Sequence, residues 1–200
     1  MYYTYFIDKT PEIQSLVAPV TCSSMISNWH KENRLITHGS ARPTDIIPVI
    51  AMNQHKHQSV FPMTWGFSDQ TPVFAIRTET AAERYPEEWA KHRCIIPASY
   101  YFENMQRADI NGEISTGERY LIQTEGSIIT HICGLYRFED NRAVCTILTR
   151  EAGEKTRFIH DRMPLIMPEA RIRAWISPDE DPEVLVKEAV TEMYWERVDD

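Results

Sequence analysis

Two short segments of the chain carry titratable side chains in settings that could support proton transfer. Residues 160–164 read His-Asp-Arg-Met-Pro, so a histidine, an acid and a guanidinium group stand beside a turn that proline fixes. Glu103 ends the apolar, aromatic segment 100–102, where burial would raise the pKa of a carboxyl group and suit it to proton transfer. Each also has a structural interpretation: the first is a solvated turn that caps a helix, and the second is a surface glutamate at a strand end.

Two further segments carry groups that could contact a nucleic acid. Arg77 could bind phosphate while Glu79 or Thr80 caps the helix expected next, although capping alone would explain the segment. Trp65 stands before a glycine and could stack on a base if exposed, but core packing is the commoner place of a lone tryptophan. The two histidines of the polar segment 55–57 have no adjacent acid or cysteine, so we expect a surface loop there and no metal site.

The elements that must position these residues follow from the hydrophobic pattern and from the prolines. Strands clustered in the middle of the chain, with helices at both ends, are typical of an α+β fold. The pattern predicts helices over residues 11–19, 21–31, 79–92, 168–175 and 182–194, and strands over residues 46–50, 60–61, 74–76 and 94–102. Residues 119–123, 127–138 and 143–149 are expected to form three consecutive antiparallel strands joined by short turns.

The composition bounds the class of protein. The 200 residues suffice for about one domain, and 25% of them are charged, as in an average soluble protein. The net charge of −8 would argue against a nucleic-acid-binding protein, yet residues 179–200 alone hold nine acidic and two basic residues, so the rest is nearly neutral. There is no membrane-length apolar run and no secretory signal, and the four cysteines are far apart. We expect a cytoplasmic, reduced protein without a membrane partner, metal or cofactor.

Taken in order, five features of the chain resemble motifs of the SOS-response-associated peptidase (SRAP) family, whose members process abasic sites in DNA. They are Trp65-Gly66, the segment 77–81, Arg93-Cys94 leading to the segment 101–103, Thr149, and the segment 160–164. The resemblance implies a single SRAP-like domain over residues 1–200, with a twisted, mostly antiparallel sheet or partly closed barrel and flanking helices. We expect the acidic stretch of about residues 179–200 to be helical, the family's last strand to be short or missing, and the protein to be a monomer.

The resemblance also implies roles for individual residues. In the family, a cysteine directly after the initiator methionine offers an amine and a thiol that close on the ring-opened aldehyde of an abasic site in single-stranded DNA and form a thiazolidine. The residues that match the family's proton-transfer groups are Glu103 and His160, and those that match its DNA-binding positions are Trp65, Arg77, Glu79, Thr80, Thr149 and Arg162.

The beginning of the chain departs from the family. Tyr2 stands where the cysteine would be, the nearest cysteine is Cys22, and Ala75 replaces an asparagine of the family. The thiazolidine therefore cannot form, and we expect the family's peptidase (autoprocessing) and lyase activities to be lost or altered in a degenerate active site.

Three hypotheses for the function follow from this departure. The first is a protein of the DNA damage or SOS response that binds single-stranded DNA without a stable crosslink. The second is an abasic-site lyase that forms a Schiff base through the Met1 amine, assisted by Glu103 and His160. The third is a fold reused to bind a protein or a small molecule.

Overall fold

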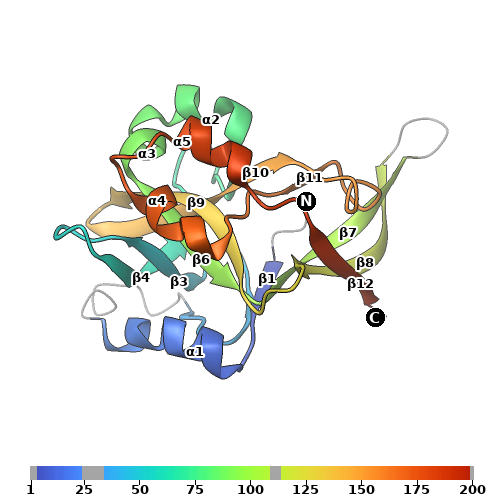
Figure 1. Ribbon diagram of the computed structural model, residues 1–200, viewed down its shortest axis with the longest axis horizontal. Helices are drawn as coiled ribbons and strands as arrows, with labels where there is room; N and C mark the ends of the chain where they lie inside the picture. The colour runs from blue at the N-terminus through green and yellow to red at the C-terminus, as the bar shows by residue number, and fades with distance from the viewer. Residues whose placement is uncertain (1–3, 24–33, 109–113, 199–200) are drawn as a thin grey trace.

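Five strands form a closed barrel at the centre of the protein. A computed structural model describes residues 4–23, 34–108 and 114–198. The barrel strands are β3 (Ile46–Met52), β4 (Gln58–Trp65), β6 (Arg93–Ala98), β9 (Thr130–Glu139) and β10 (Arg142–Glu151). They are ordered β10, β4, β3, β6 and β9, and β9 also pairs with β10, which closes the ring (Figure 1). Every pair in the ring is antiparallel except that of β4 with β10.

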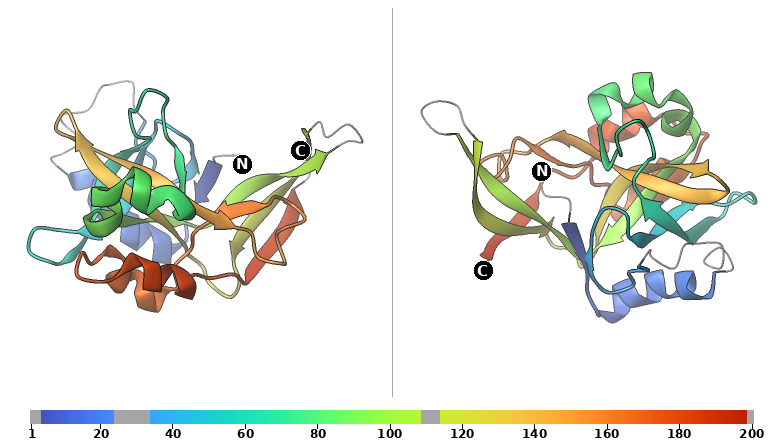
Figure 2. Two further views of the ribbon diagram at one scale, coloured as in Figure 1. Left: turned by 90° about the horizontal axis from the view of Figure 1, so that it is seen from above. Right: turned by 180° about the vertical axis from the view of Figure 1, so that it is seen from behind.

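A second sheet lies beside the barrel. Its antiparallel strands run in the order β12 (Met193–Val198), β8 (Ile114–Thr124), β7 (Tyr100–Ala108), β1 (Thr4–Ile7) and β2 (Gly39–Ala41). Figure 2 shows the β7 and β8 hairpin reaching away from the barrel, with β12 along its side. Because only Ser99 separates β6 from β7, the chain passes directly from the barrel into this sheet.

Short helices cover the barrel on two sides. The helices α2 (Thr78–Arg84), α3 (Pro86–Lys91), α4 (Ile172–Ile176) and α5 (Pro182–Leu185) lie together on one side, and α1 (Pro11–Val17) lies on the other (Figures 1 and 2). Short 3-10 helices over Ala18–Cys22, Glu169–Arg171 and Val186–Glu188 extend α1, α4 and α5. No helix in the described ranges is long and apolar enough to cross a membrane.

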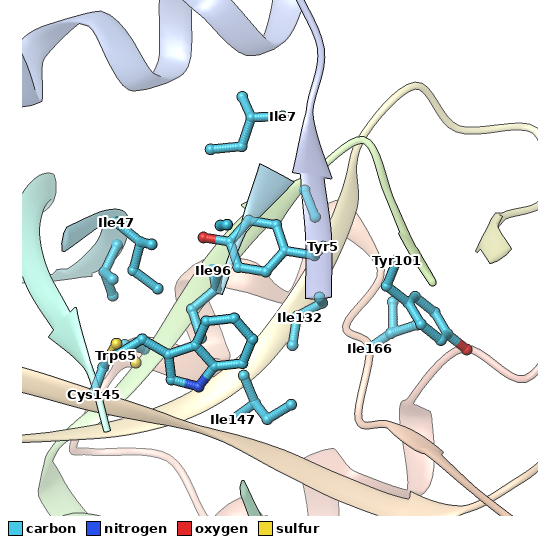
Figure 3. Packing of buried hydrophobic residues seen from close by; sticks show 14 of the residues in the cluster. Tyr5, Ile7, Ile47, Trp65, Ile96, Tyr101, Ile132, Cys145, Ile147 and Ile166 are labelled. Atoms are coloured by element: carbon cyan, nitrogen blue, oxygen red, sulfur yellow. The ribbon is translucent and has the colours of Figure 1, made fainter. Parts of the chain in front are cut away.

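The barrel strands contribute to two hydrophobic cores, because successive side chains of a strand point to opposite faces of the sheet. The inward set includes Trp65 and Ile96, and the Tyr5 ring of β1 joins it with its centroid 5.5 Å from that of Trp65 (Figure 3). The outward set packs beneath α2 to α5, around Trp89 and Trp175. The helices are thus held to the barrel by apolar contacts on one face of each strand.

Arg93, the first residue of β6, ties the helical layer to the barrel. Its side chain is buried, and its guanidinium group donates hydrogen bonds to backbone carbonyl oxygens only. The acceptors belong to Trp89, Ala90, Trp175, Ser177 and Glu180. A buried cation is tolerated here because these hydrogen bonds replace the water that it loses.

The α+β class expected from the sequence is confirmed, with mostly antiparallel strands, a barrel and flanking helices. The expectation of three consecutive antiparallel strands after residue 119 is wrong in one part, because only β9 and β10 pair while β8 belongs to the second sheet. The helix predicted over 79–92 is divided, since α2 ends at Arg84 and α3 begins at Pro86. Proline cannot donate the backbone hydrogen bond that an unbroken helix would need there.

The acidic C-terminal stretch is not helical throughout, contrary to the prediction. The helical part ends at Glu188, and β12 then pairs with β8 from Met193 to Val198. The last strand, expected to be short or missing, is therefore present. The predicted elements also omitted β1, β2 and a strand over Arg162–Pro164. Most of the helix predicted over 21–31 lies outside the described residues.

Candidate functional site

The candidate site lies where two short strands flank the end of β10. Strand β5 (Ala75–Arg77) pairs in parallel with one side of β10, and β11 (Arg162–Pro164) pairs antiparallel with the other. In this register Thr149 is opposite Arg77 on one side and Pro164 on the other. The topology therefore brings the segments 77–81 and 160–164 to the same strand, although they are far apart in the sequence.

Arg162 joins these segments. Its Nη1 and Nη2 atoms donate to the two carboxylate oxygens of Glu79 at 2.7 and 2.9 Å, and Nη2 also donates to the carbonyl oxygen of Thr149 at 2.8 Å. The paired geometry is the strong form of the arginine–carboxylate contact. The hydrogen bonds from Arg162 lower the pKa of Glu79 to about 2, so this carboxylate is ionised throughout the neutral range.

Threonine hydroxyls complete the network around the first turn of α2. The Thr78 hydroxyl donates to the carbonyl oxygen of Thr149 at 3.2 Å, and the Thr149 hydroxyl donates to a β5 carbonyl oxygen at 3.3 Å. The Thr80 hydroxyl donates back to the carbonyl oxygen of Arg77 at 3.3 Å. No side chain caps the helix at its N-cap, Arg77. The Glu79 carboxylate does accept its own backbone N–H in this first turn, as the capping role considered for it requires, whereas the Thr80 hydroxyl donates to a carbonyl oxygen instead.

His160 is buried two residues before Arg162. The backbone N–H of Arg162 donates to His160 Nδ1 at 2.9 Å, and a carboxylate oxygen of Asp161 lies 2.8 Å from the same nitrogen. The first contact needs a lone pair on Nδ1, whereas the second needs a proton there. Burial lowers the pKa of His160, so the ring is neutral at pH 7. A neutral imidazole ring can donate one hydrogen bond and accept another.

Glu103 lies on β7, with only 3% of its surface exposed. Its Cα partner on β8 is Tyr120, and the Tyr120 ring contacts that of Phe158 with 5.6 Å between centroids. Phe158 belongs to the loop 152–161, which also holds His160. The contact between this loop and the second sheet thus brings the two predicted proton-transfer residues into the same region.

A hollow of about 370 Å³ opens beside the network. Its lining residues are Arg77, Glu151, Arg157, Asp161 and Arg162. The Arg77 guanidinium group is exposed and makes no hydrogen bond or ion pair with another described residue. Arg162 is already paired with Glu79, whereas the guanidinium groups of Arg77 and Arg157 are suited to a phosphate. Sequence reasoning missed Arg157, and the only available signal was a basic residue three positions before His160.

Trp65, one of the predicted site residues, takes no part in this arrangement. Trp65 is 1% exposed, and its indole N–H donates to the carbonyl oxygen of Phe74 at 2.9 Å. Trp65 packs in the barrel core beside Tyr5, so it cannot stack on a base from this position (Figure 3). Tyr2 lies outside the described residues. Among the residues that the structure describes, no three His, Cys, Asp or Glu side chains are grouped as metal ligands.

Comparison with known proteins finds curated relatives in Bacillus subtilis. The chain is 33% identical over 117 residues to abasic site processing protein YobE, a match that covers 54% of this chain and 51% of that protein. It is 31% identical over 109 residues to abasic site processing protein YoaM, with 51% of this chain and 46% of that protein covered. The chain thus spans about half the length of the curated relatives it matches.

Solved structures share the fold over nearly the whole chain. A phage-related protein from Bordetella bronchiseptica superimposes with a TM-score of 0.72 at 15% identity, covering 99% of this chain and 94% of that one. A protein from Bacteroides thetaiotaomicron gives a TM-score of 0.72 at 17% identity, with 99% and 92% covered. The family described as SOS response associated peptidase (SRAP) matches residues 11–200. The chain therefore belongs to the SOS response associated peptidase family.

Proposed function

We propose that this chain binds single-stranded DNA, with backbone phosphates at Arg77 and Arg157 in the hollow that Arg162 also lines, and an abasic residue against Glu103 and His160. The observation that carries the proposal is that three guanidinium groups line one hollow beside buried titratable side chains. Guanidinium groups bind phosphate through paired hydrogen bonds, and phosphates dominate the affinity of proteins for nucleic acids. Similarity to proteins named for abasic site processing supports the choice of substrate.

Stable capture of the abasic site is not part of the proposal. A thiazolidine needs an amine and a thiol on one residue, and position 2 is tyrosine. Cys94, Cys133 and Cys145 are buried, and burial raises the pKa of each thiol, so these cysteines remain protonated and unreactive. Cys22 is exposed, but it ends the short helix that continues α1, on the other side of the barrel from α2 (Figure 1).

Glu103 and His160 would move protons on the sugar of the abasic residue. The closed sugar is a hemiacetal, and its opening to the aldehyde removes a proton from one oxygen and delivers a proton to another. Two titratable groups that both reach the sugar can perform both transfers. His160 is neutral at pH 7 because burial lowers its pKa, so its ring has one protonated and one unprotonated nitrogen for proton transfer to the ring oxygen. Glu103 would then accept the proton of the hydroxyl group.

The position of β1 favours a second function, cleavage of the DNA through a Schiff base. Thr4 pairs with Phe102, the neighbour of Glu103. Three residues span at most about 10 Å, so an amine on Met1 could reach an aldehyde held at Glu103. The amine nitrogen would add to the aldehyde carbon and water would leave, giving an imine. A base would then remove the proton from the next carbon, and the 3′ phosphate would depart as the double bond forms.

One experiment separates these functions. Purified protein is titrated with labelled single-stranded DNA, with or without one abasic site, and the mixtures are then run on denaturing gels with and without borohydride. We expect tighter binding to the abasic strand and no adduct that survives denaturation. A cut strand together with a borohydride-trapped adduct would establish the Schiff-base function instead. A heat-stable adduct formed without borohydride would contradict our conclusion that stable capture is lost. Absence of DNA binding would favour the third hypothesis, in which the fold binds a protein or a small molecule.

A further inference from the structure

An exposed aromatic pair beside the candidate site has no role in the function proposed above. Phe158 and Trp195, together called the aromatic platform, have ring centroids 4.9 Å apart. Both rings rest on Tyr120, at 5.6 and 5.7 Å. Tyr120 is 7% exposed, whereas Phe158 and Trp195 are 45% and 40% exposed. Two large apolar rings that lie side by side and exposed to water indicate a binding surface, because a ligand that covers them removes apolar area from water.

The platform shares a face of the second sheet with Glu103. Across the strands Glu103 is the partner of Tyr120, and Tyr120 is the partner of Arg197 on β12. Cross-strand partners point to one face, as do residues two apart in a strand, so Trp195 lies on the face of Glu103. Neighbouring strands are about 4.8 Å apart and Trp195 is two residues along β12 from Arg197, which puts its backbone about 12 Å from that of Glu103. Phe158 comes from the loop that holds Arg157 of the hollow.

We propose that Phe158 and Trp195 stack on a base that flanks the abasic residue. The inference rests on the proposed function, since it assigns a base-binding subsite to the same DNA. A base beside an abasic residue lacks a stacking neighbour on one side, and an aromatic ring can take that place. Stacking tolerates any sequence because every base has a π face. Tyr120 holds both rings in place, so little side-chain entropy is lost on binding.

A nucleic-acid base fits the platform better than a protein surface does. A stable protein interface buries roughly 800 Å² on each partner, whereas an aromatic side chain buries about 150–250 Å² in all. Two half-exposed rings therefore supply only a small part of such an interface, but they match the area of one base. Arg157, next to Phe158 in the chain, lines the hollow proposed for phosphate. An aromatic surface continuous with basic side chains is the arrangement that binds single-stranded nucleic acids.

The test compares alanine variants of the platform with a matched aromatic control. Phe138→Ala is the control, because Phe138 is 63% exposed and pairs with Ala143, six residues along β10 from Thr149 and thus about 20 Å away. Binding is measured by fluorescence anisotropy on single-stranded DNA that holds one abasic site between ordinary nucleotides. We expect Trp195→Ala to weaken binding roughly 5- to 150-fold, with Phe138→Ala unchanged. Trp195→Phe keeps a ring and should lose much less.

A second DNA identifies the contact as one with a base. When the flanking nucleotides also lack bases, the wild type and Trp195→Ala should bind equally, while the salt dependence of binding should be the same for both proteins. Equal binding of the wild type and Trp195→Ala to the base-bearing strand would overturn the platform and leave the proposed function intact. Failure of the wild type to bind any single-stranded DNA would overturn both. Thermal unfolding of each variant checks that the fold is retained.

Discussion

Replacement of Arg77 by alanine isolates the electrostatic part of DNA binding. The Arg77 side chain is exposed, lines the hollow, and makes no hydrogen bond or ion pair with another described residue. Its removal should change the free energy of unfolding by no more than about 0.5 kcal/mol, as expected for a surface position. The variant would lose one phosphate contact while Arg157 keeps its own.

The salt dependence of binding counts these contacts. On single-stranded DNA each neutralised phosphate contributes about −0.7 to the slope of log K against log salt concentration. Arg162 is paired with Glu79, so Arg77 and Arg157 predict a slope of about −1.4 for the wild type and −0.7 for Arg77→Ala. An increase in salt from about 50 to 200 mM should then weaken the wild type roughly 7-fold and the variant roughly 3-fold.

Fluorescence anisotropy over a series of salt concentrations measures the two slopes. Arg142→Ala is the matched control, because Arg142 begins β10 whereas the site lies at the other end of that strand. The control should keep the wild-type slope. Identical slopes for the wild type and Arg77→Ala would refute the placement of a phosphate in the hollow. A smaller slope for Arg142→Ala would mean that the DNA follows a different path.

Three further substitutions test the network, the histidines and the tie of the helical layer. Arg162→Lys keeps the charge but loses the paired hydrogen bonds to the half-exposed Glu79, so urea unfolding should show a loss of about 1 kcal/mol in the free energy of unfolding. An unchanged urea midpoint would contradict a stabilising role of this ion pair. Burial lowers the pKa values of His160 and His131, so the contribution of these residues to stability should be complete above about pH 6.5 and fall as the pH drops below it. Thermal unfolding of His160→Gln should show a smaller loss of stability with falling pH than the wild type. An equal loss in both proteins would refute the role of His160. Arg93→Met leaves five carbonyl oxygens without their donor and should cost about 3–5 kcal/mol in urea unfolding, whereas a loss below about 1 kcal/mol would show that water replaces the guanidinium.

The barrel strands could be predicted from the sequence, but their assignment to sheets could not. Strands such as β3 and β6 are apolar on both faces, because one face lines the barrel interior and the other lies beneath helices. Residues 125–129 join β8 to β9, and a connection of that length permits either a hairpin or a passage between sheets. Strand β12 is exposed at most positions, so it lacks the alternation that reveals a strand.

The site could be predicted only where its residues lie in short motifs. Glu79, Thr149 and Arg162 come from three motifs, and the pairing of β5 and β11 with β10 joins them. Arg157 and Trp195 have no such local mark, since their place depends on how a loop and an edge strand pack against the second sheet. The burial of Trp65 likewise depends on Tyr5, sixty residues earlier in the chain, which the sequence pattern alone does not place.

The candidate site contains residues that hold the strands together and exposed residues that the strands carry, and variants of the two groups test different things. Glu79, Thr149 and Arg162 hold β5, β10 and β11 together, so any chain with this local structure needs them whether or not it binds DNA. Loss of binding in their variants would therefore report on structure as much as on recognition. Arg77 and Trp195 are exposed, and the strands that carry them are fixed by backbone pairing. Because the fold does not require their side chains, a loss of DNA affinity on their removal can be attributed to contact with the ligand.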